Sequence, residues 1–337
     1  MVTDIICHSK TTICDYDINS VIDVIRQGRS MAGSENRIFR SNIAEFLEKD
    51  NVFLFSSGSM ALYHILLALE VKKGDDILLP TYVCSSVSKA IEAVGATCVF
   101  YDNAENSWLS AYQEIKKRIT KNTKAIIVVH IFGIRFNDVE KMCDLNIPII
   151  EDCAHAFSSR INKQPISTFS LCSFYSFNAT KLLAAGEGGA VASDNKYFMN
   201  ALENRILDCG LSDLNCAFGN AQLKQYSSFL NKRKEIANYY FEHLGGIAKE
   251  LKLLDSLYFR FPVLVSNPVS YLFDRTILYK RGVDCLLHKA YQTKNNVFIN
   301  SEKVFEQTVS VPIYPSLTQH ELKKIVEDVV KKYCEKN

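Results

Sequence analysis

The sequence lacks the features that mark secreted, membrane and nucleic-acid-binding proteins. Its formal net charge is only +2, which is too small to attract nucleic acid or an anionic membrane. The longest strongly apolar run, 125–134, is interrupted by His130 and Gly133 and is far too short to span a bilayer. The N-terminal segment has no basic start followed by an apolar stretch, so we expect no signal peptide. These absences predict a cytoplasmic protein without a membrane or nucleic-acid partner.

The eleven cysteines follow neither a disulfide pattern nor a zinc pattern. Their number is odd, and no C-x-x-C pair occurs. Cys98, Cys143, Cys153 and Cys172 lie within apolar runs, where a free thiol packs as a small hydrophobic group. We therefore expect reduced, mostly buried thiols and no metal site.

The length of 337 residues suggests one large domain and a smaller one. In the first part of the chain, short and almost continuously apolar runs alternate with amphipathic segments, which is typical of a mostly parallel sheet with helices on both faces. We predict an α/β fold with seven strands, at 52–56, 76–79, 97–101, 124–130, 148–151, 171–177 and 189–192. The predicted helices between the earlier strands are 60–70, 86–94, 109–119 and 138–145.

The pattern changes after residue 211. A long helical stretch, 212–244, ends at two glycines, and a smaller α+β region follows. We place the domain boundary within the long helix, which gives a large domain at 1–235 and a small C-terminal domain at 236–337. The elements predicted for the small domain are a strand at 257–265, a helix from about 269 to 280, and a last helix after Pro315 that opens with a capping box at 318–321.

Residues 55–62 (FSSGSMAL) form the first of three segments with chemically useful residues at strand ends. A predicted strand ends here and a helix begins, with Gly58, Ser59 and Met60 at its start. The free N–H groups and the positive dipole end of a helix N-terminus can bind a phosphate. Taken alone, however, the segment is more often an ordinary capped helix start.

The second segment is the acidic end of the predicted strand near 148–151, where Glu151 and Asp152 follow a buried apolar run. Ligands of open α/β sheets bind at the carboxyl edge of the strands. A carboxylate there can hold a cationic partner such as a protonated pyridine nitrogen. A solvated strand end is at least as common, and His155 alone is more often structural than catalytic.

The third segment places Lys181 just beyond an apolar strand, in a turn that leads to the glycine-rich residues 186–189. Desolvation lowers the pKa of a lysine, as a Schiff-base nucleophile requires. A solubilising surface lysine is the weaker interpretation here. Together the three segments offer a phosphate cradle, an anion for a ring nitrogen and an amine for an aldehyde, which are what pyridoxal 5′-phosphate needs from a protein.

In this order, the segments resemble the DegT/DnrJ/StrS family of pyridoxal-phosphate-dependent sugar aminotransferases, which belong to the fold-type I enzymes. The resemblance extends from about Gly28 to the C-terminus. Its six blocks are SSGSMAL (56–62), TKAIIVVHIFG (123–133), EDCAHA (151–156), SFNATKLLAAGEGGAV (176–191), LSDLNCAFGNAQL (211–223) and VPIYPSLT (311–318).

The resemblance implies roles for individual residues. Lys181 would form the Schiff base with the cofactor, Asp152 would pair with the pyridine nitrogen, and His155 would lie near the ring hydroxyl. Lys181 and Asp152 are the expected catalytic residues. The expected cofactor-binding residues are Gly58, Ser59, Met60, Tyr82, Cys84, Asp152, His155, Ser176 and Lys181.

The resemblance also implies the reaction. An amino group would pass from an amino acid, usually L-glutamate, to a keto sugar on a nucleotide, in the biosynthesis of O-antigen, other cell-surface polysaccharides or related amino sugars. A homodimer is expected, because each site in this family takes residues from its partner. Two alternatives stay open: an enzyme of the same fold that acts on another carbonyl substrate, and a non-catalytic descendant that serves as a regulator or partner protein.

The sequence departs from the family pattern at three places. The family usually has an aromatic residue at Cys84, stacked on the cofactor ring, and Tyr82 is a candidate to replace it. Asp208 stands where an asparagine is expected to reach the partner subunit's phosphate, and its charge would repel that group. The segment 195–211, which normally helps to build the substrate entrance, is short. We therefore expect an intact cofactor site and an altered substrate site.

Overall fold

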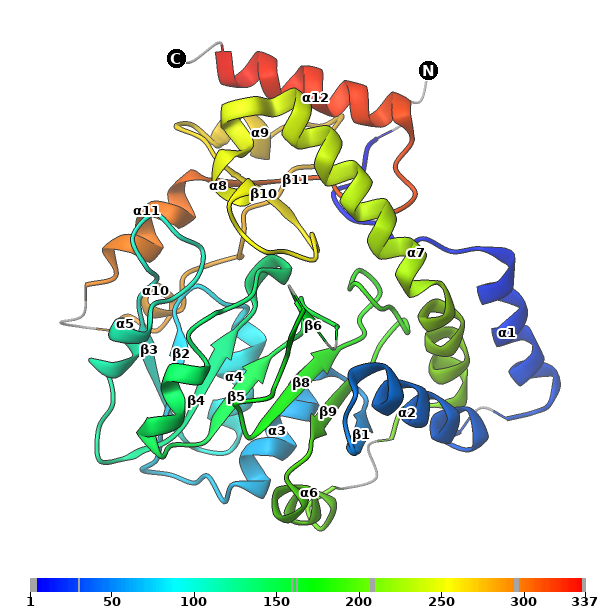
Figure 1. Ribbon diagram of the computed structural model, residues 1–337, viewed down its shortest axis with the longest axis vertical. Helices are drawn as coiled ribbons and strands as arrows, with labels where there is room; N and C mark the ends of the chain where they lie inside the picture. The colour runs from blue at the N-terminus through cyan, green and yellow to red at the C-terminus, as the bar shows by residue number, and fades with distance from the viewer. Residues whose placement is uncertain are drawn as a thin grey trace.

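The computed structural model describes residues 5–29, 31–158, 160–161, 163–206, 210–293 and 297–334. A seven-stranded sheet forms the centre of the larger part of the chain, with the strand order β1-β9-β8-β5-β4-β2-β3 (Figure 1). Its strands are β1 (Asn51–Phe55), β2 (Asp76–Pro80), β3 (Thr97–Tyr101), β4 (Thr123–Val129), β5 (Ile149–Asp152), β8 (Cys172–Ser176) and β9 (Gly189–Ser193). All seven predicted strands are confirmed.

The sheet is mostly parallel, and only β9 runs against its neighbours β1 and β8. Alternate side chains of β2 enter different cores: Ile77 and Leu79 pack with α3 (Gly58–Ala68) and α4 (Ser85–Ala93), whereas Leu78 packs on the other face. Because both faces are buried in this way, each strand is a nearly continuous apolar run. The predicted α/β architecture with helices on both sides is confirmed.

The long helix α7 (Asp213–Leu244) links the large sheet to the C-terminal part of the chain (Figure 1). The Ser212 side chain caps its first turn by accepting the N–H of Asn215 at 3.3 Å. Beyond it lie the antiparallel pair β10 (Phe261–Leu264) and β11 (Thr308–Val311), and the last helix α12 (Gln319–Cys334). The domain boundary near residue 235 stays a prediction.

Thr318 and Glu321 form the predicted capping box before α12. The Glu321 carboxylate accepts the Thr318 N–H at 2.8 Å, and Thr318 Oγ1 accepts the Glu321 N–H at 3.2 Å. The remaining elements are α1 (Asp15–Arg26), α2 (Ser34–Leu47), α5 (Tyr112–Lys116), η1 (Ile131–Gly133), η2 (Glu140–Leu145), β6 (Arg160–Ile161), β7 (Gln164–Pro165), α6 (Lys196–Glu203), η3 (Gly245–Ala248), α8 (Lys249–Lys252), α9 (Val269–Leu272), α10 (Leu287–Ala290) and α11 (Ile299–Gln307).

The helix predicted from 269 to 280 is wrong beyond its first turn. Helix α9 ends at Leu272, and the side chain of Asp274 then accepts the backbone N–H groups of Thr276 at 2.7 Å and Ile277 at 2.8 Å. These bonds hold a turn that competes with helix continuation. The apolar residues that follow belong to an extended segment, in which Ile277 pairs with Ile6.

The expectation that most thiols are buried is also wrong. The ten described cysteines are free, but only Cys153, Cys172 and Cys216 are buried, and Cys143 is exposed. Among the described residues, no helix combines the length and apolar character that a membrane crossing requires.

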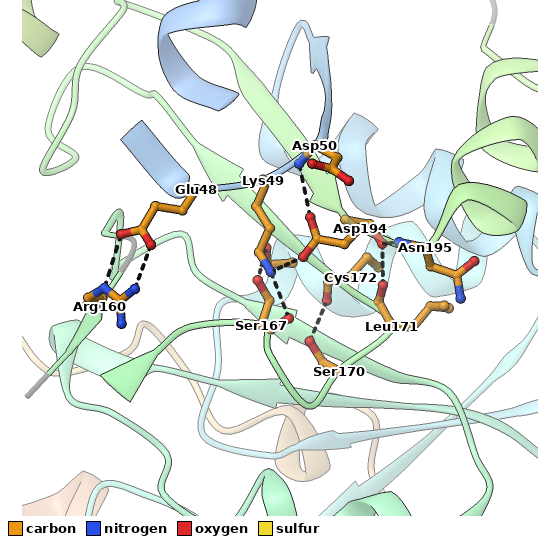
Figure 2. A network of polar contacts seen from close by, with 12 residues as sticks. Glu48, Lys49, Asp50, Arg160, Ser167, Ser170, Leu171, Cys172, Asp194 and Asn195 are labelled. Atoms are coloured by element: carbon orange, nitrogen blue, oxygen red, sulfur yellow. Dashed lines mark hydrogen bonds and ion pairs between the residues drawn. The ribbon is translucent and has the colours of Figure 1, made fainter. Parts of the chain in front are cut away.

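A polar network joins the residues just before the start of β1 to the residue just after the end of β9 (Figure 2). The ammonium of Lys49 is almost buried and lies 2.7 Å from the carboxylate of Asp194, which also accepts the Asp50 N–H at 3.0 Å. Next to it, Arg160 and Glu48 form a two-point ion pair on the surface. The network lies at the opposite end of these strands from the loops that follow β5 and β8, so it stabilises the sheet without taking part in the site described next.

Candidate active site

A cavity of about 350 Å³ lies at the carboxyl edge of the large sheet. The loops that follow β1, β2, β4, β5 and β8 converge there because the carboxyl ends of parallel strands share one edge. Residues far apart in sequence are thereby brought together. The lining consists of Ser56, Ser57, Gly58, Ser59, Leu62, Val83, Cys84, Ser86, Val87, Val129, Ile131, Asp152, Ala154, His155, Phe174, Ser176, Asn178, Lys181, Glu187 and Gly188.

The start of α3 forms one wall of the cavity. Ser57 caps this helix by accepting the Met60 N–H at 3.1 Å, so the backbone group predicted to hold a phosphate is already engaged. Gly58 packs tightly against β8, because a Cβ there would lie 3.1 Å from the Ser176 Cβ. Gly58, Ser59 and Ser176 thus line the cavity together, next to the positive end of the α3 dipole.

Asp152 closes β5 and presents its carboxylate to the cavity. The side chain is 5% exposed, and Oδ1 accepts the Ala154 N–H at 2.9 Å. Burial raises the pKa of Asp152, while the Ala154 hydrogen bond and the charge of Lys181 oppose that rise. A cationic ligand beside Asp152 would offset the cost of its burial.

Lys181 lies in the turn after β8 and lines the same cavity as Asp152. Its Nζ stands 5.1 Å from the centre of the Phe259 ring. Burial lowers the pKa of Lys181 to about 8, although the negative charge of Asp152 acts in the opposite direction. Roughly a tenth of this amine is therefore neutral, and nucleophilic, at pH 7, and more of it at higher pH.

His155 is held as a neutral hydrogen-bond donor. Its ring stacks on Phe259, with centroids 4.2 Å apart, and its Nδ1 accepts the Phe132 N–H at 3.2 Å. Because Nδ1 carries a lone pair, the ring proton resides on Nε2. Burial and the positive charges of Lys181 and Arg260 lower the pKa of His155 well below its ordinary value. The imidazole can therefore donate one hydrogen bond from Nε2 without carrying a charge.

Tyr82 and Cys84 occupy different surroundings. Cys84 lines the cavity at the start of α4. Tyr82 is not among the lining residues: its ring is buried against Phe132, and its hydroxyl lies so close to Gly282 that a Cβ there would be 1.9 Å away. The structure therefore does not bring Tyr82 to the position where it would replace the missing aromatic residue.

Two nearby features have no counterpart among the predicted site residues. Phe259 contacts both His155 and Lys181, and the half-buried Arg260 adjoins it. Arg260 could have been singled out from the sequence, because it is a charged residue within the apolar run 257–265. Asp208 lies outside the described residues. In the short segment 195–211, residues 196–203 form α6, which packs against α3 and β9.

Comparisons with known proteins agree with this geometry. The chain is 28% identical over 342 residues to GDP-perosamine synthase of Escherichia coli O157:H7, covering 91% of this chain and 92% of that protein. It is 27% identical to dTDP-3-amino-3,6-dideoxy-alpha-D-galactopyranose transaminase of Aneurinibacillus thermoaerophilus, covering 91% and 92% of the two proteins.

A solved structure confirms the predicted fold class. NtdA from Bacillus subtilis, determined with the bound cofactor PMP, superposes with a TM-score of 0.83 at 20% identity, over 96% of this chain and 85% of that one. Residues 12–207 and 201–330 match the DegT/DnrJ/EryC1/StrS aminotransferase family. The match covers nearly the whole sequence. The chain belongs to the DegT/DnrJ/EryC1/StrS aminotransferase family.

Proposed function

We propose that the chain uses pyridoxal 5′-phosphate on Lys181 to move an amino group from an amino acid, L-glutamate by preference, to a keto sugar carried on a nucleotide. The observation that carries this proposal is that Lys181 and the buried Asp152 line the same cavity. Membership of the aminotransferase family supports the reaction type.

The residues of the cavity fit this cofactor. Gly58, Ser59 and Ser176, at the positive end of α3, would hold the phosphate. The Asp152 carboxylate would accept a hydrogen bond from the protonated pyridine nitrogen. Nε2 of His155 would donate a hydrogen bond to the oxygen of the ring hydroxyl. The Met60 N–H already has an acceptor in Ser57, so we assign no phosphate contact to it.

When bound, the cofactor supplies an aldehyde that condenses with amines and an electron-poor ring that stabilises negative charge on carbon. Lys181 supplies the amine that holds the aldehyde, and once displaced by the donor it can carry a proton at Nζ as general acid and base. Asp152 keeps the ring positive by offering a fixed carboxylate in a site with little solvent. The buried side chains of Ile131 and Phe174 and the half-buried Val129 form an apolar wall that limits the access of water to this chemistry.

The relatives named above guide the choice of substrate. The names of these two relatives describe enzymes that make a GDP-linked and a dTDP-linked amino sugar. This supports a nucleotide-linked keto sugar as the substrate of the present chain. We further propose a role in O-antigen or related polysaccharide synthesis.

A cytoplasmic homodimer is the form we propose. Exposed free thiols at Cys7, Cys84 and Cys143 fit a reducing compartment. Exposed apolar residues near and on α1, such as Ile13 and Ile18, offer a face for a second copy of the chain.

The test of this function is a two-step titration of the purified, cofactor-loaded protein. L-Glutamate should shift the visible absorption band of the cofactor as the amino group is taken up, and a nucleotide-linked keto sugar should then restore it. Panels of GDP-, UDP- and dTDP-linked keto sugars would identify the nucleotide. A loaded protein whose spectrum responds to no amino acid would contradict the proposal.

The pH dependence of cofactor loading follows from Lys181. Only the neutral amine attacks an aldehyde, and the pKa of Lys181 is lowered to about 8 by burial. The rate at which cofactor-free protein captures pyridoxal phosphate should therefore rise about tenfold per pH unit below pH ~8 and level off above it. Stopped-flow absorbance measures this rate. A rate that still climbs tenfold per unit beyond pH ~9.5 would show an amine with an ordinary lysine pKa.

A further inference from the structure

Arg260 is a half-buried guanidinium immediately before β10. Its Nη1 donates to the backbone carbonyl oxygens of Arg281 at 3.0 Å and Gly282 at 2.8 Å. Its Nε is buried and has no acceptor among the described residues. One edge of the guanidinium is thus satisfied by the fold, whereas the edge formed by Nε and Nη2 bonds to no described group.

The charge of Arg260 also lacks a counter-ion. The side chain forms no ion pair with a described residue, and the acid that influences it, Asp284, is exposed to solvent. Burial lowers the pKa of Arg260. Buried cations in proteins are normally paired with an anion, because desolvation of an unpaired charge is costly.

A second arginine is more deeply buried and likewise forms no ion pair with a described residue, but its hydrogen bonds differ from those of Arg260. Arg233 of α7 is 5% exposed and donates through Nη1 to the carbonyl oxygens of Tyr258, Phe259 and Ile313. None of its nitrogens is left buried without an acceptor. Its structural role, which is to join α7 to the segment before β10, accounts for it fully. The same account leaves the Nε edge of Arg260 unexplained.

Arg260 lies close to the reacting amine. The centre of the Phe259 ring is 5.8 Å from Arg260 Cζ and 5.1 Å from Lys181 Nζ. The positive charge of Arg260 contributes to the lowered pKa of both Lys181 and His155. Neither Arg260 nor Phe259 is among the residues that line the cavity. An anion that binds Arg260 would therefore lie beside the cavity, on the side where Phe259 contacts Lys181.

We propose that Arg260 binds an anionic oxygen group, carboxylate or phosphate, of a substrate through its Nε–Nη2 edge. This proposal rests on the function proposed above. The side-on edge of a guanidinium offers two parallel N–H donors that match such groups. Because Nε has no exposed surface at present, binding includes a small rotation of the side chain towards the cavity. The anion belongs either to the amino donor, as a carboxylate, or to the nucleotide, as a phosphate.

Binding without turnover tests this assignment. Glutarate has the carboxylates of glutamate but no amine, and UDP, GDP and dTDP carry the phosphates of the sugar substrates. Isothermal titration calorimetry of the cofactor-loaded protein would measure Kd for each probe. The Arg260→Gln substitution should raise the Kd for glutarate, or for one nucleoside diphosphate, by about 10- to 100-fold.

Arg281→Gln is the matched control. Arg281 is a half-buried arginine between α9 and α10, and its backbone carbonyl oxygen accepts from Arg260. Its own side chain donates to the Phe305 carbonyl oxygen and lies over the Phe305 ring. Its substitution should leave the affinities within about twofold of the unmodified protein. Loss confined to glutarate identifies the donor carboxylate, and loss confined to a nucleoside diphosphate identifies the phosphate.

Two outcomes overturn the proposal: a folded Arg260→Gln protein that keeps both affinities, or an unmodified protein that binds none of the probes. Neither of these outcomes depends on catalysis, so they are distinct from a failure of the two-step titration.

Phenylglyoxal labelling of the unmodified protein covers the case in which the variant does not fold. A bound probe should protect Arg260 and not Arg281 from modification, as read by peptide mapping. Equal labelling of Arg260 with and without saturating probe would also refute the assignment.

Discussion

Replacement of Lys181 with alanine should reduce amino transfer by about 10⁴-fold or more while the protein still folds. The substitution removes both the amine that holds the cofactor and the proton carrier of the cavity. Folding should survive, because burial lowers the pKa of Lys181 to about 8 and the side chain forms no ion pair with a described residue. Turnover assays would measure the loss of amino transfer, and circular dichroism would show that the protein folds. Borohydride reduction followed by peptide mapping would show that no cofactor is attached at residue 181.

Lys49→Ala is the matched control for this experiment. Lys49 is likewise nearly buried, but its ammonium pairs with Asp194 at the far end of the sheet (Figure 2). Its loss should lower the melting temperature, since the nearly buried ammonium loses its contacts with Asp194 and the Ser167 carbonyl oxygen, and should leave turnover nearly unchanged. Added methylamine should restore part of the activity of the Lys181→Ala protein. Near-normal turnover of that protein without added amine would refute the assigned role.

The sequence carries the information for the sheet and for the cavity because both depend on local pattern. Strands buried on two faces are continuous apolar runs, so all seven were predictable. Asp152 ends β5, and Lys181 lies in the turn that follows β8. The two strands are paired neighbours, and parallel strands present such ends at one edge. Their meeting in one cavity follows from this rule.

The direction in which a side chain points depends on residues far along the chain, so it could not be predicted from local pattern. Tyr82 follows β2 even more closely than Cys84 does, yet its ring packs in the core against Phe132 and Gly282, which lie far along the chain. Arg260 sits within an apolar run, and only the tertiary fold places it beside Phe259 and Lys181.

Asp152→Asn should leave the cofactor bound but slow amino transfer by about 10³-fold. The amide keeps the size of the side chain and can still accept the Ala154 N–H. It carries no charge, however, and cannot keep the ring nitrogen of the cofactor protonated. Burial of Asp152 makes this charge effective, because little solvent screens it. Single-turnover kinetics with L-glutamate, together with the absorption spectrum of the bound cofactor, would separate chemistry from binding.

Glu151→Gln is the control that shows whether the carboxylate must face the cavity. Glu151 precedes Asp152 in β5, and successive side chains of a strand point to opposite faces. Its Oε2 accepts a hydrogen bond from Nε2 of His130 at 2.7 Å, because Nδ1 of that ring accepts the Phe136 N–H. A glutamine can accept the same bond, so transfer should slow by no more than about threefold. Equal losses from both substitutions would mean that any buried charge at the end of β5 matters, and the specific role of the cavity-facing carboxylate would fall.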